Sequence, residues 1–296
     1  MRHRETTEAG TLSTDALREN ATDFLNAGLD LLFHKRLDQR RGKLALVALQ
    51  TAVELLVKYR LVQEQGLSSI LVKKKTDTVV DLNTVRTITY SDTLEKVEGL
   101  EGLLDWDRYV IDEMAAIRNS LVHFTAEIDL ERLKLQCNAI ACTALAMFAM
   151  GQARDHGEMN NYRVFLSESN FRRLTENESY RSEALDAAYD CLDTEGVKHC
   201  YKCKCESLSL RVSDVYFCHC CGFSINKEVV GFADCVLCDS HSMVFYDAYN
   251  TTGVSHYGRC IACEVFQWVE QCSECGEKIV TTTPQLETSC DCHCAE

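Results

Sequence analysis

The feature that most constrains this fold is a series of five Cys-x2-Cys pairs in the last third of the chain. Two intervening residues let one tight turn point both sulfur atoms at the same metal ion, and two such turns complete a tetrahedron. This spacing predicts zinc ribbons, and a region so rich in ligands binds its metal as part of folding. The pairs are Cys200/Cys203, Cys218/Cys221, Cys235/Cys238, Cys260/Cys263 and Cys272/Cys275.

Sequential pairing joins the first pair to the second and the third to the fourth. The fifth pair is then completed from the tail, by Cys290 and His293, with Cys292 and Cys294 as alternative ligands. This scheme predicts about three structural zinc ions, and an interleaved scheme uses the same ligands. The predicted ligands are Cys200, Cys203, Cys218, Cys221, Cys235, Cys238, Cys260, Cys263, Cys272, Cys275, Cys290 and His293.

Not every thiol is used in this scheme, and Cys205 and Cys220 are among those left over. One alternative gives these thiols a redox or catalytic role. Another replaces zinc by an iron–sulfur cluster. Closed four-ligand sites leave no open position for water, which favours a structural role for the metal.

The sequence pattern predicts a reducing compartment, because it contains neither an export signal nor a membrane-spanning run. The first residues are charged with no apolar segment after them, and the longest apolar run, residues 139–150, is too short to span a bilayer. We therefore expect a cytoplasmic protein with no membrane contact. In the cytosol, paired cysteines indicate metal ligands more often than disulfides.

The first half of the sequence has the apolar spacing of helices, and its mostly short connections predict an antiparallel bundle. We expect a mainly α fold: a helical bundle over residues 12–155, a linker with an amphipathic helix over 156–196, and a small β-rich zinc-ribbon array over 197–296. The expected helices span residues 14–37, 43–63, 91–104, 105–124 and 129–153.

A candidate catalytic motif, Arg118-Asn119-x3-His123, closes one of these helices. Asn119 and His123 are four residues apart and share a helical face, and the adjacent Arg118 is long enough to reach the same space. Histidine moves protons near neutral pH, and arginine holds the charge of a phosphate. RNA supplies its own nucleophile, so the motif predicts phosphodiester cleavage without a catalytic metal. The alternative is a helix-end salt bridge beside a structural histidine.

With the preceding helix Ala52-Val-Glu-Leu-Leu-Val-Lys58, this motif resembles that of the HEPN superfamily over about residues 14–155. HEPN ribonucleases share an Arg-x4-6-His motif, often with a polar residue after the arginine. The resemblance implies that Arg118, Asn119 and His123 are catalytic and that two protomers form a composite cleft. It also implies metal-independent cleavage to a 2′,3′-cyclic phosphate and a role as a toxin or antiviral defence effector. The zinc ligands are not part of that family pattern.

The net charge of −14 excludes general polyanion binding, so an RNA contact needs a local basic patch. Residues 198–296 hold 7 basic and 13 acidic residues, a net −6, and this acidity favours a protein partner for the zinc module. Two basic runs are the candidate RNA guides, although such runs are also common on solvated surfaces. They comprise Arg36, Arg40, Arg41, Lys43, Lys73, Lys74 and Lys75.

Three functions therefore compete. The first is a HEPN-type endoribonuclease whose zinc module serves dimerisation, sensing or targeting. The second is a non-catalytic adaptor that presents a zinc ribbon to a protein partner. The third is a zinc-ribbon factor that acts on nucleic acid directly, with Phe266 or Trp268 stacked on a base.

Overall fold

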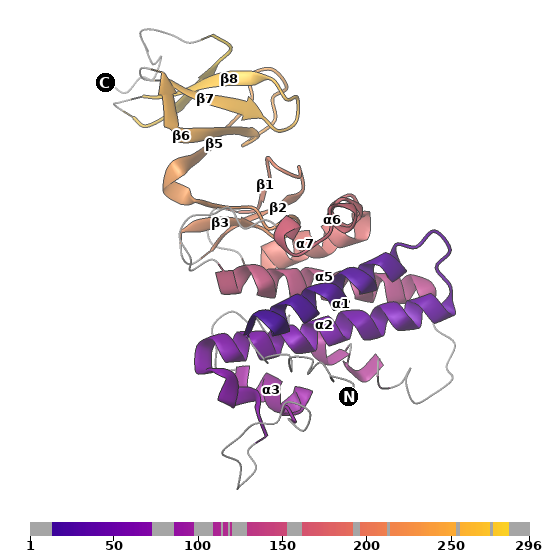
Figure 1. The fold of residues 1–296 in the computed structure, drawn as a ribbon. Coiled ribbons are helices and arrows are strands. Elements are labelled where there is room, and N and C mark those ends of the chain that lie inside the picture. The colour runs from indigo at the N-terminus through magenta and orange to yellow at the C-terminus, as the bar shows by residue number, and fades with distance from the viewer. Residues whose placement is uncertain are drawn as a thin grey trace, which may run out of the picture. The chain divides into compact units, whose positions relative to one another are not determined.

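A computed structural model divides the chain into two compact units (Figure 1). The first comprises Met1–Arg154 with Arg163–Leu174, and the second comprises Asp155–Tyr162 with Thr175–Glu296. The structure describes residues 14–72, 86–97, 109–113, 115–117, 119, 129–152, 162–191, 196–211, 214–252, 255–272 and 275–283.

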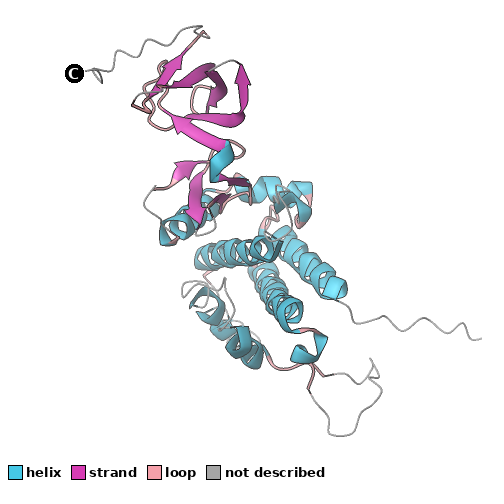
Figure 2. Cartoon of the chain, turned by 90° about the vertical axis from the view of Figure 1, so that its left-hand side faces the viewer, coloured by secondary structure: helices cyan, strands magenta, loops and turns pink. Residues whose placement is uncertain are grey.

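Three long helices form the first unit: α1 (Thr14–Leu32), α2 (Gln39–Gln65) and α5 (Leu130–Gln152). The three helices lie side by side (Figures 1 and 2). Their buried aliphatic residues include Leu25, Leu49 and Leu145. Helices α1 and α2 approach closely at Gly28, where a Cβ atom would lie 2.7 Å from the Leu49 Cγ. Glycine at this position therefore sets the spacing of the two helices.

Local sequence explains where these helices begin and end. Asp38 caps α2, because its carboxylate accepts a hydrogen bond from the Arg41 N–H at 2.8 Å. Gly66, with a φ of 80°, ends the same helix, and its N–H donates to the Val62 carbonyl. Asp129 caps α5 by accepting from the Glu131 N–H at 3.0 Å, as its position in the sequence suggests.

Shorter elements complete the description between α2 and α5. A 3-10 turn, η1 (Leu67–Ile70), follows α2, and an isolated bridge pairs Leu71 with Thr87. Helix α3 (Tyr90–Val97) comes next. Residues 109–113, 115–117 and 119 are helical.

Gln50, Glu54 and Lys58 form a polar stripe along α2 at a spacing of four residues, and most of it is buried. Its spacing is typical of a narrow solvated face, but the structure leaves only 7% of Gln50 and 5% of Lys58 exposed. The Lys58 ammonium donates to Glu54 at 2.7 Å and to the Thr87 hydroxyl at 3.1 Å. Thr87 thus contacts Lys58 from outside α2, and no periodicity within α2 reveals that contact.

Helix α6 (Glu168–Thr175) belongs to the first unit, and Asn26 of α1 is bonded to the segment that begins it. The Asn26 amide donates to the Phe165 carbonyl at 2.8 Å, and its oxygen accepts from the Ser167 N–H at 2.8 Å. The Asn170 amide adds a bond to the same oxygen at 3.2 Å. The short turn η2 (Tyr162–Val164) precedes α6.

The second unit begins with α7 (Glu178–Asp190) and continues as two antiparallel sheets with strands in sequential order (Figure 2). The turn η3 (Lys227–Val229) lies between the two sheets in sequence. The first sheet contains β1 (Lys198–His199), β2 (Glu206–Arg211), β3 (Val215–Cys218) and β4 (Ser224–Asn226). The second contains β5 (Val230–Ala233), β6 (Val244–Thr252), β7 (Ser255–Cys260), β8 (Phe266–Gln271) and β9 (Lys278–Thr281).

The fold class predicted from the sequence is wrong. A mainly α protein with a small ribbon array was expected, whereas a helical N-terminal region is followed by a β-rich region with sheets of four and five strands. The Cys-x2-Cys spacing predicts the turns but not the length of the strands between them, and β6 alone has nine residues. One face of the second sheet supplies a core of its own through Val244, Tyr246 and Val269.

The division into residues 12–155, 156–196 and 197–296 stays a prediction. The middle segment contains two described helices, α6 and α7, where one was expected. Among the described residues, no helix is long and apolar enough to cross a membrane.

Candidate metal centres and the predicted site residues

All five Cys-x2-Cys pairs adopt one kind of turn. In each, the N–H of the first cysteine donates to the carbonyl five residues later, at 2.8–3.0 Å. The residue after the second cysteine has a positive φ, between 51° and 74°, which brings the chain back over both sulfur atoms. Two of these residues are glycines, as a left-handed backbone favours, and three have side chains. They are Lys204, Gly222, Asp239, Glu264 and Gly276.

The first candidate centre joins the turn after β1 to the turn between β3 and β4. The sulfur atoms of Cys200, Cys203, Cys218 and Cys221 all lie within 4.8 Å of one another. The Cys200 and Cys221 sulfurs are 3.7 Å apart, and those of Cys203 and Cys218 are 3.6 Å apart. Three of the four residues are buried, and Cys203 is half-buried.

The second candidate centre joins the turn after β5 to the turn between β7 and β8. It brings together Cys235, Cys238, Cys260 and Cys263, again within 4.8 Å of one another. The closest sulfur pairs are Cys235 with Cys263, at 3.7 Å, and Cys238 with Cys260, at 3.8 Å. Both groups follow sequential pairing rather than interleaved pairing.

These separations fit zinc. Four sulfurs bound tetrahedrally at about 2.3 Å from a zinc ion lie about 3.8 Å apart, which is close to the 3.6–3.8 Å of two pairs in each group. Four cysteine ligands fill the coordination shell and leave no position for a substrate. The geometry therefore supports a structural metal, whose chemistry is to hold two turns together.

Environment separates the pKa values of neighbouring thiols. In the first centre, hydrogen bonds from the other cysteines lower the pKa of Cys203, while burial raises that of Cys218. In the second, burial raises the pKa of Cys260 to about 12. Burial acts in the same direction on Cys235, but hydrogen bonds from Gln267 and from backbone N–H groups outweigh it and lower its pKa to about 6. Each centre thus has at least one thiol prepared to bind a cation as the thiolate.

Groups around the sulfurs orient the ligands. The Gln267 amide, fully buried on β8, donates to the Cys235 sulfur at 2.8 Å. The Ser207 hydroxyl lies 3.3 Å from the Cys218 sulfur. Sequence reasoning missed both residues, since β8 and β2 supply them and no Cys-x2-Cys spacing indicates them.

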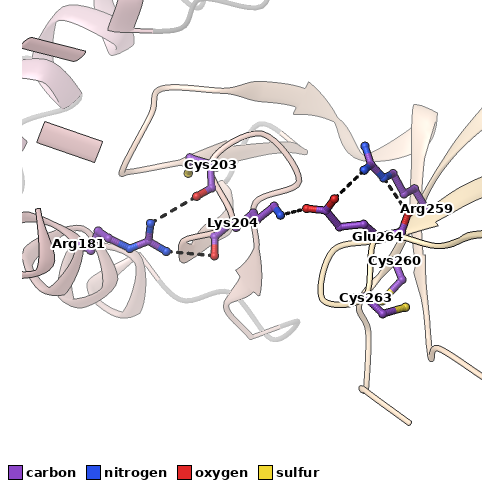
Figure 3. Close-up of polar contacts among 7 residues, drawn as sticks. All are labelled: Arg181, Cys203, Lys204, Arg259, Cys260, Cys263 and Glu264. Atoms are coloured by element: carbon purple, nitrogen blue, oxygen red, sulfur yellow. Dashed lines mark hydrogen bonds and ion pairs between the residues drawn. The ribbon is translucent and has the colours of Figure 1, made fainter. Parts of the chain in front are cut away.

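A chain of polar contacts links the two centres within the second unit (Figure 3). The Glu264 carboxylate accepts from the Lys204 ammonium and, at 3.0 Å, from the Arg259 guanidinium. Lys204 and Glu264 each directly follow the second cysteine of a pair. Arg181 of α7 donates to the carbonyls of Cys203 and Lys204, at 3.4 and 3.2 Å.

Aromatic packing joins the two sheets at the same place. Tyr201, between two ligands of the first centre, stacks on Phe245 of β6 with ring centroids 4.1 Å apart. Phe232 of β5 contacts both Phe245 and Tyr216 of β3 edge-on. The two sheets thus pack against each other, and one ligand turn of each centre, at Lys204 and at Glu264, takes part in the contact.

Two leftover thiols lie beside the first centre. Cys205 and Cys220 are both buried. A hydrogen bond from Cys220 helps to lower the pKa of Cys205 to about 7. The structure places them next to the four ligands but outside the group that encloses the candidate metal position.

The fifth pair is described without its predicted partners. Cys272 is buried and Cys275 exposed, and their turn has the same hydrogen bonds as the other four. Cys290 and His293 lie outside the described residues. A third zinc site therefore stays a prediction.

Most of the predicted catalytic motif also lies outside the described residues. Arg118 and His123 are not described, while Asn119 is helical and exposed. Of the predicted RNA guides, Lys73, Lys74 and Lys75 are outside the described part of the chain.

The basic connector between α1 and α2 is described. Arg36 and Arg41 line a cavity, whereas Arg40 is exposed and Lys43 half-buried on the first turns of α2. The connector is thus divided, and only part of it faces a space that a ligand can enter.

Comparisons with protein-family models, with curated proteins and with solved structures found no match to this chain.

Proposed function

We propose that this chain is a metal-independent endoribonuclease whose C-terminal region is held together by structural zinc. The single observation behind the nuclease is the motif Arg118-Asn119-x3-His123. The described residues that lead into it are helical and Asn119 is exposed, so a helix presents this part of the motif to solvent.

The reaction needs only groups that RNA and the motif supply. The 2′-oxygen forms a bond to phosphorus as its hydroxyl loses a proton, and the bond from phosphorus to the 5′-oxygen breaks. That oxygen takes up a proton, which leaves a 2′,3′-cyclic phosphate and a 5′-hydroxyl. His123 moves protons, Arg118 holds the charge on the phosphate, and Asn119 orients His123 or the substrate. In a homodimer, two such motifs form one cleft, and an RNA-cleaving toxin or defence effector is the corresponding biological role.

Zinc serves structure in this proposal. The two tetracysteine groups each bind one Zn²⁺, and Cys272 and Cys275 bind a third ion with Cys290 and His293. When bound, the ions neutralise thiolate charge and join turns from separate hairpins. The module they form serves dimerisation, sensing or targeting of the nuclease.

The test is an RNA cleavage assay on full-length, zinc-loaded protein at a low EDTA concentration that leaves its zinc bound. Wild type should cleave and leave 2′,3′-cyclic phosphate ends, while His123→Ala and Arg118→Ala should lose at least a hundredfold in rate. Arg132→Ala, an exposed arginine of α5, is the control and should cleave normally. No cleavage of a broad RNA panel by the folded wild-type dimer would contradict the proposal.

One observation favours a second function, a non-catalytic adaptor that binds a protein. Apolar side chains are exposed around the second tetracysteine group, with 49% of Val236, 52% of Leu237 and 50% of Phe266 accessible. An acidic module with an apolar tip suits a protein partner better than a phosphate backbone. An adaptor should retain its partner when His123 is replaced and should not cleave RNA.

A further inference from the structure

The cavity at the end of α1 has a composition unlike the rest of the molecule. It has a volume of about 450 Å³ and is open to solvent. Its wall includes five basic residues, three from the connector between α1 and α2, one from the first turn of α2 and one from α6. They are His34, Lys35, Arg36, Arg41 and Arg173.

The charge of this wall is opposite to that of the chain. Lys35, Arg36, Arg41 and Arg173 contribute four positive charges, against one negative charge from Asp30. The whole chain has a net charge of −14. A positive, concave surface on an acidic protein attracts anions selectively to one place.

Two of the arginines are held in place by neighbours. Arg41 is paired with Asp38 and donates to the Arg36 carbonyl at 3.1 Å. The Arg173 guanidinium lies 3.7 Å from the Asp30 carboxylate. These contacts orient the guanidinium groups and reduce the entropy lost when they bind a ligand.

The other two cations are available to a ligand. Among the described residues, the side chains of Lys35 and Arg36 have no carboxylate partner, and both are exposed. A bound phosphate can thus contact them without breaking an existing ion pair. Arginine also matches a phosphate with two parallel hydrogen bonds.

We infer that this cavity binds a phosphate group of RNA, with the adjoining base against Phe33. Phe33 lines the cavity and is half-buried, so it offers an aromatic surface beside the cations. The volume is in the range of small-ligand sites, about 300–1,000 Å³. The inference rests on the proposed function and extends it. It adds Lys35 and Arg173 to the RNA-binding residues and leaves out Arg40 and Lys43, which do not line the cavity.

The test measures RNA binding separately from cleavage. Full-length, zinc-loaded His123→Ala protein is titrated into a fluorescent 12-nucleotide single-stranded RNA, and anisotropy is followed over a range of salt. Lys35→Ala/Arg36→Ala should weaken binding at least tenfold and reduce the slope of log K against log salt by about 1.4, since about 0.7 is lost per contact. Arg173→Ala should weaken binding three- to tenfold.

A matched control removes the same charge elsewhere. Arg132 and Lys134, on α5, are exposed and half-buried, respectively, and each is paired with an acid, so Arg132→Ala/Lys134→Ala should change binding less than twofold. Equal weakening by both double variants, no weakening by either, or no RNA binding by the parent protein would overturn the inference. Binding that weakens only with the cavity variants supports it, even where wild type fails to cleave, so the two proposals fail separately.

Competitors identify which phosphate is bound. RNA with a 5′-phosphate that binds better than the same RNA with a 5′-hydroxyl, together with displacement by AMP, assigns the cavity to a terminal phosphate. Equal binding of both RNAs assigns it to an internal phosphodiester. Inorganic phosphate that displaces RNA as well as AMP does would overturn the contact with Phe33.

Discussion

Replacing Gly222 by alanine should destabilise the Cys218–Cys221 turn of the first candidate centre without changing any of its four cysteines. Gly222 has a φ of 71°, and a Cβ atom there would lie 2.4 Å from Cδ1 of Tyr162. The left-handed backbone costs an alanine about 1–2 kcal/mol. Tyr162 is fully buried, and its N–H is bonded to the Cys221 carbonyl, so it yields poorly, and overpacking adds about 1–3 kcal/mol. The sum is about 2–5 kcal/mol.

Gly276→Ala is the matched control. It has nearly the same φ, 74°, but the nearest atom to its Cβ would be 3.6 Å away, on the flexible Gln271 side chain. We therefore expect about 1–2 kcal/mol at this position, from the backbone alone.

Hydrogen exchange followed by mass spectrometry measures the local opening of the turns that contain Gly222 and Gly276 in the zinc-loaded protein. At about 1.4 kcal/mol for each tenfold change, protection of the peptide covering residues 206–226 should fall by roughly 30-fold to several thousandfold in Gly222→Ala. Protection of residues 268–283 should fall by only about 5- to 30-fold in Gly276→Ala. Equal falls in protection in the two variants would refute the reasoning, because the contact with Tyr162 would then add nothing to the cost of the Gly222→Ala substitution.

Three further predictions concern single side chains. Gln267→Ala removes the N–H donor to the Cys235 sulfur, so zinc affinity measured by chelator competition should fall about 10- to 100-fold, and an unchanged affinity would exclude an orienting role. Asn26→Ala removes the bonds between α1 and the segment that begins α6 and should lower the free energy of unfolding by about 1–3 kcal/mol in urea titrations, whereas a loss below about 0.5 kcal/mol would contradict that role. Asp38→Ala should lower the melting temperature more than Asp38→Asn, which still caps α2. The hydrogen bond from the Arg41 N–H lowers the pKa of the Asp38 carboxyl. The stabilisation by the ionised cap is therefore complete above about pH 4 and is lost as the pH falls through the folded-state pKa of Asp38. The melting temperatures of the two variants should thus differ from that of wild type less at pH 2.5 than at pH 6.

Local patterns in the sequence predict much of this fold. Two helix ends follow from single residues, because Asp129 supplies an acceptor for free N–H groups and Gly66 supplies a left-handed backbone. The ligand groups follow from the Cys-x2-Cys spacing, because the turn geometry is set within six residues. The predicted helix 43–63 starts four residues late, since the first turn of α2 is polar and has no apolar spacing to reveal it.

Features that depend on distant contacts escape such reasoning. The buried Lys58 ammonium is bonded to Thr87, outside α2, and the orientation of Cys235 depends on Gln267, 32 residues away. The phosphate cavity needs Arg173, which lies more than 130 residues from the connector it completes. The size of the two sheets was underestimated for the same reason, because the spacing of the cysteines does not indicate which strands pair between hairpins.

The central structural claim is that separate four-ligand centres, two of them tetracysteine groups, each bind one zinc ion and organise the C-terminal region. Native mass spectrometry of the full-length protein counts these ions directly. We predict three zinc ions in wild type, the loss of one in each of Cys218→Ser, Cys260→Ser and Cys272→Ser, and none lost in Cys205→Ser. Two zinc ions in wild type would contradict the third site, and fewer than two, or the loss of an ion in Cys205→Ser, would contradict the whole account.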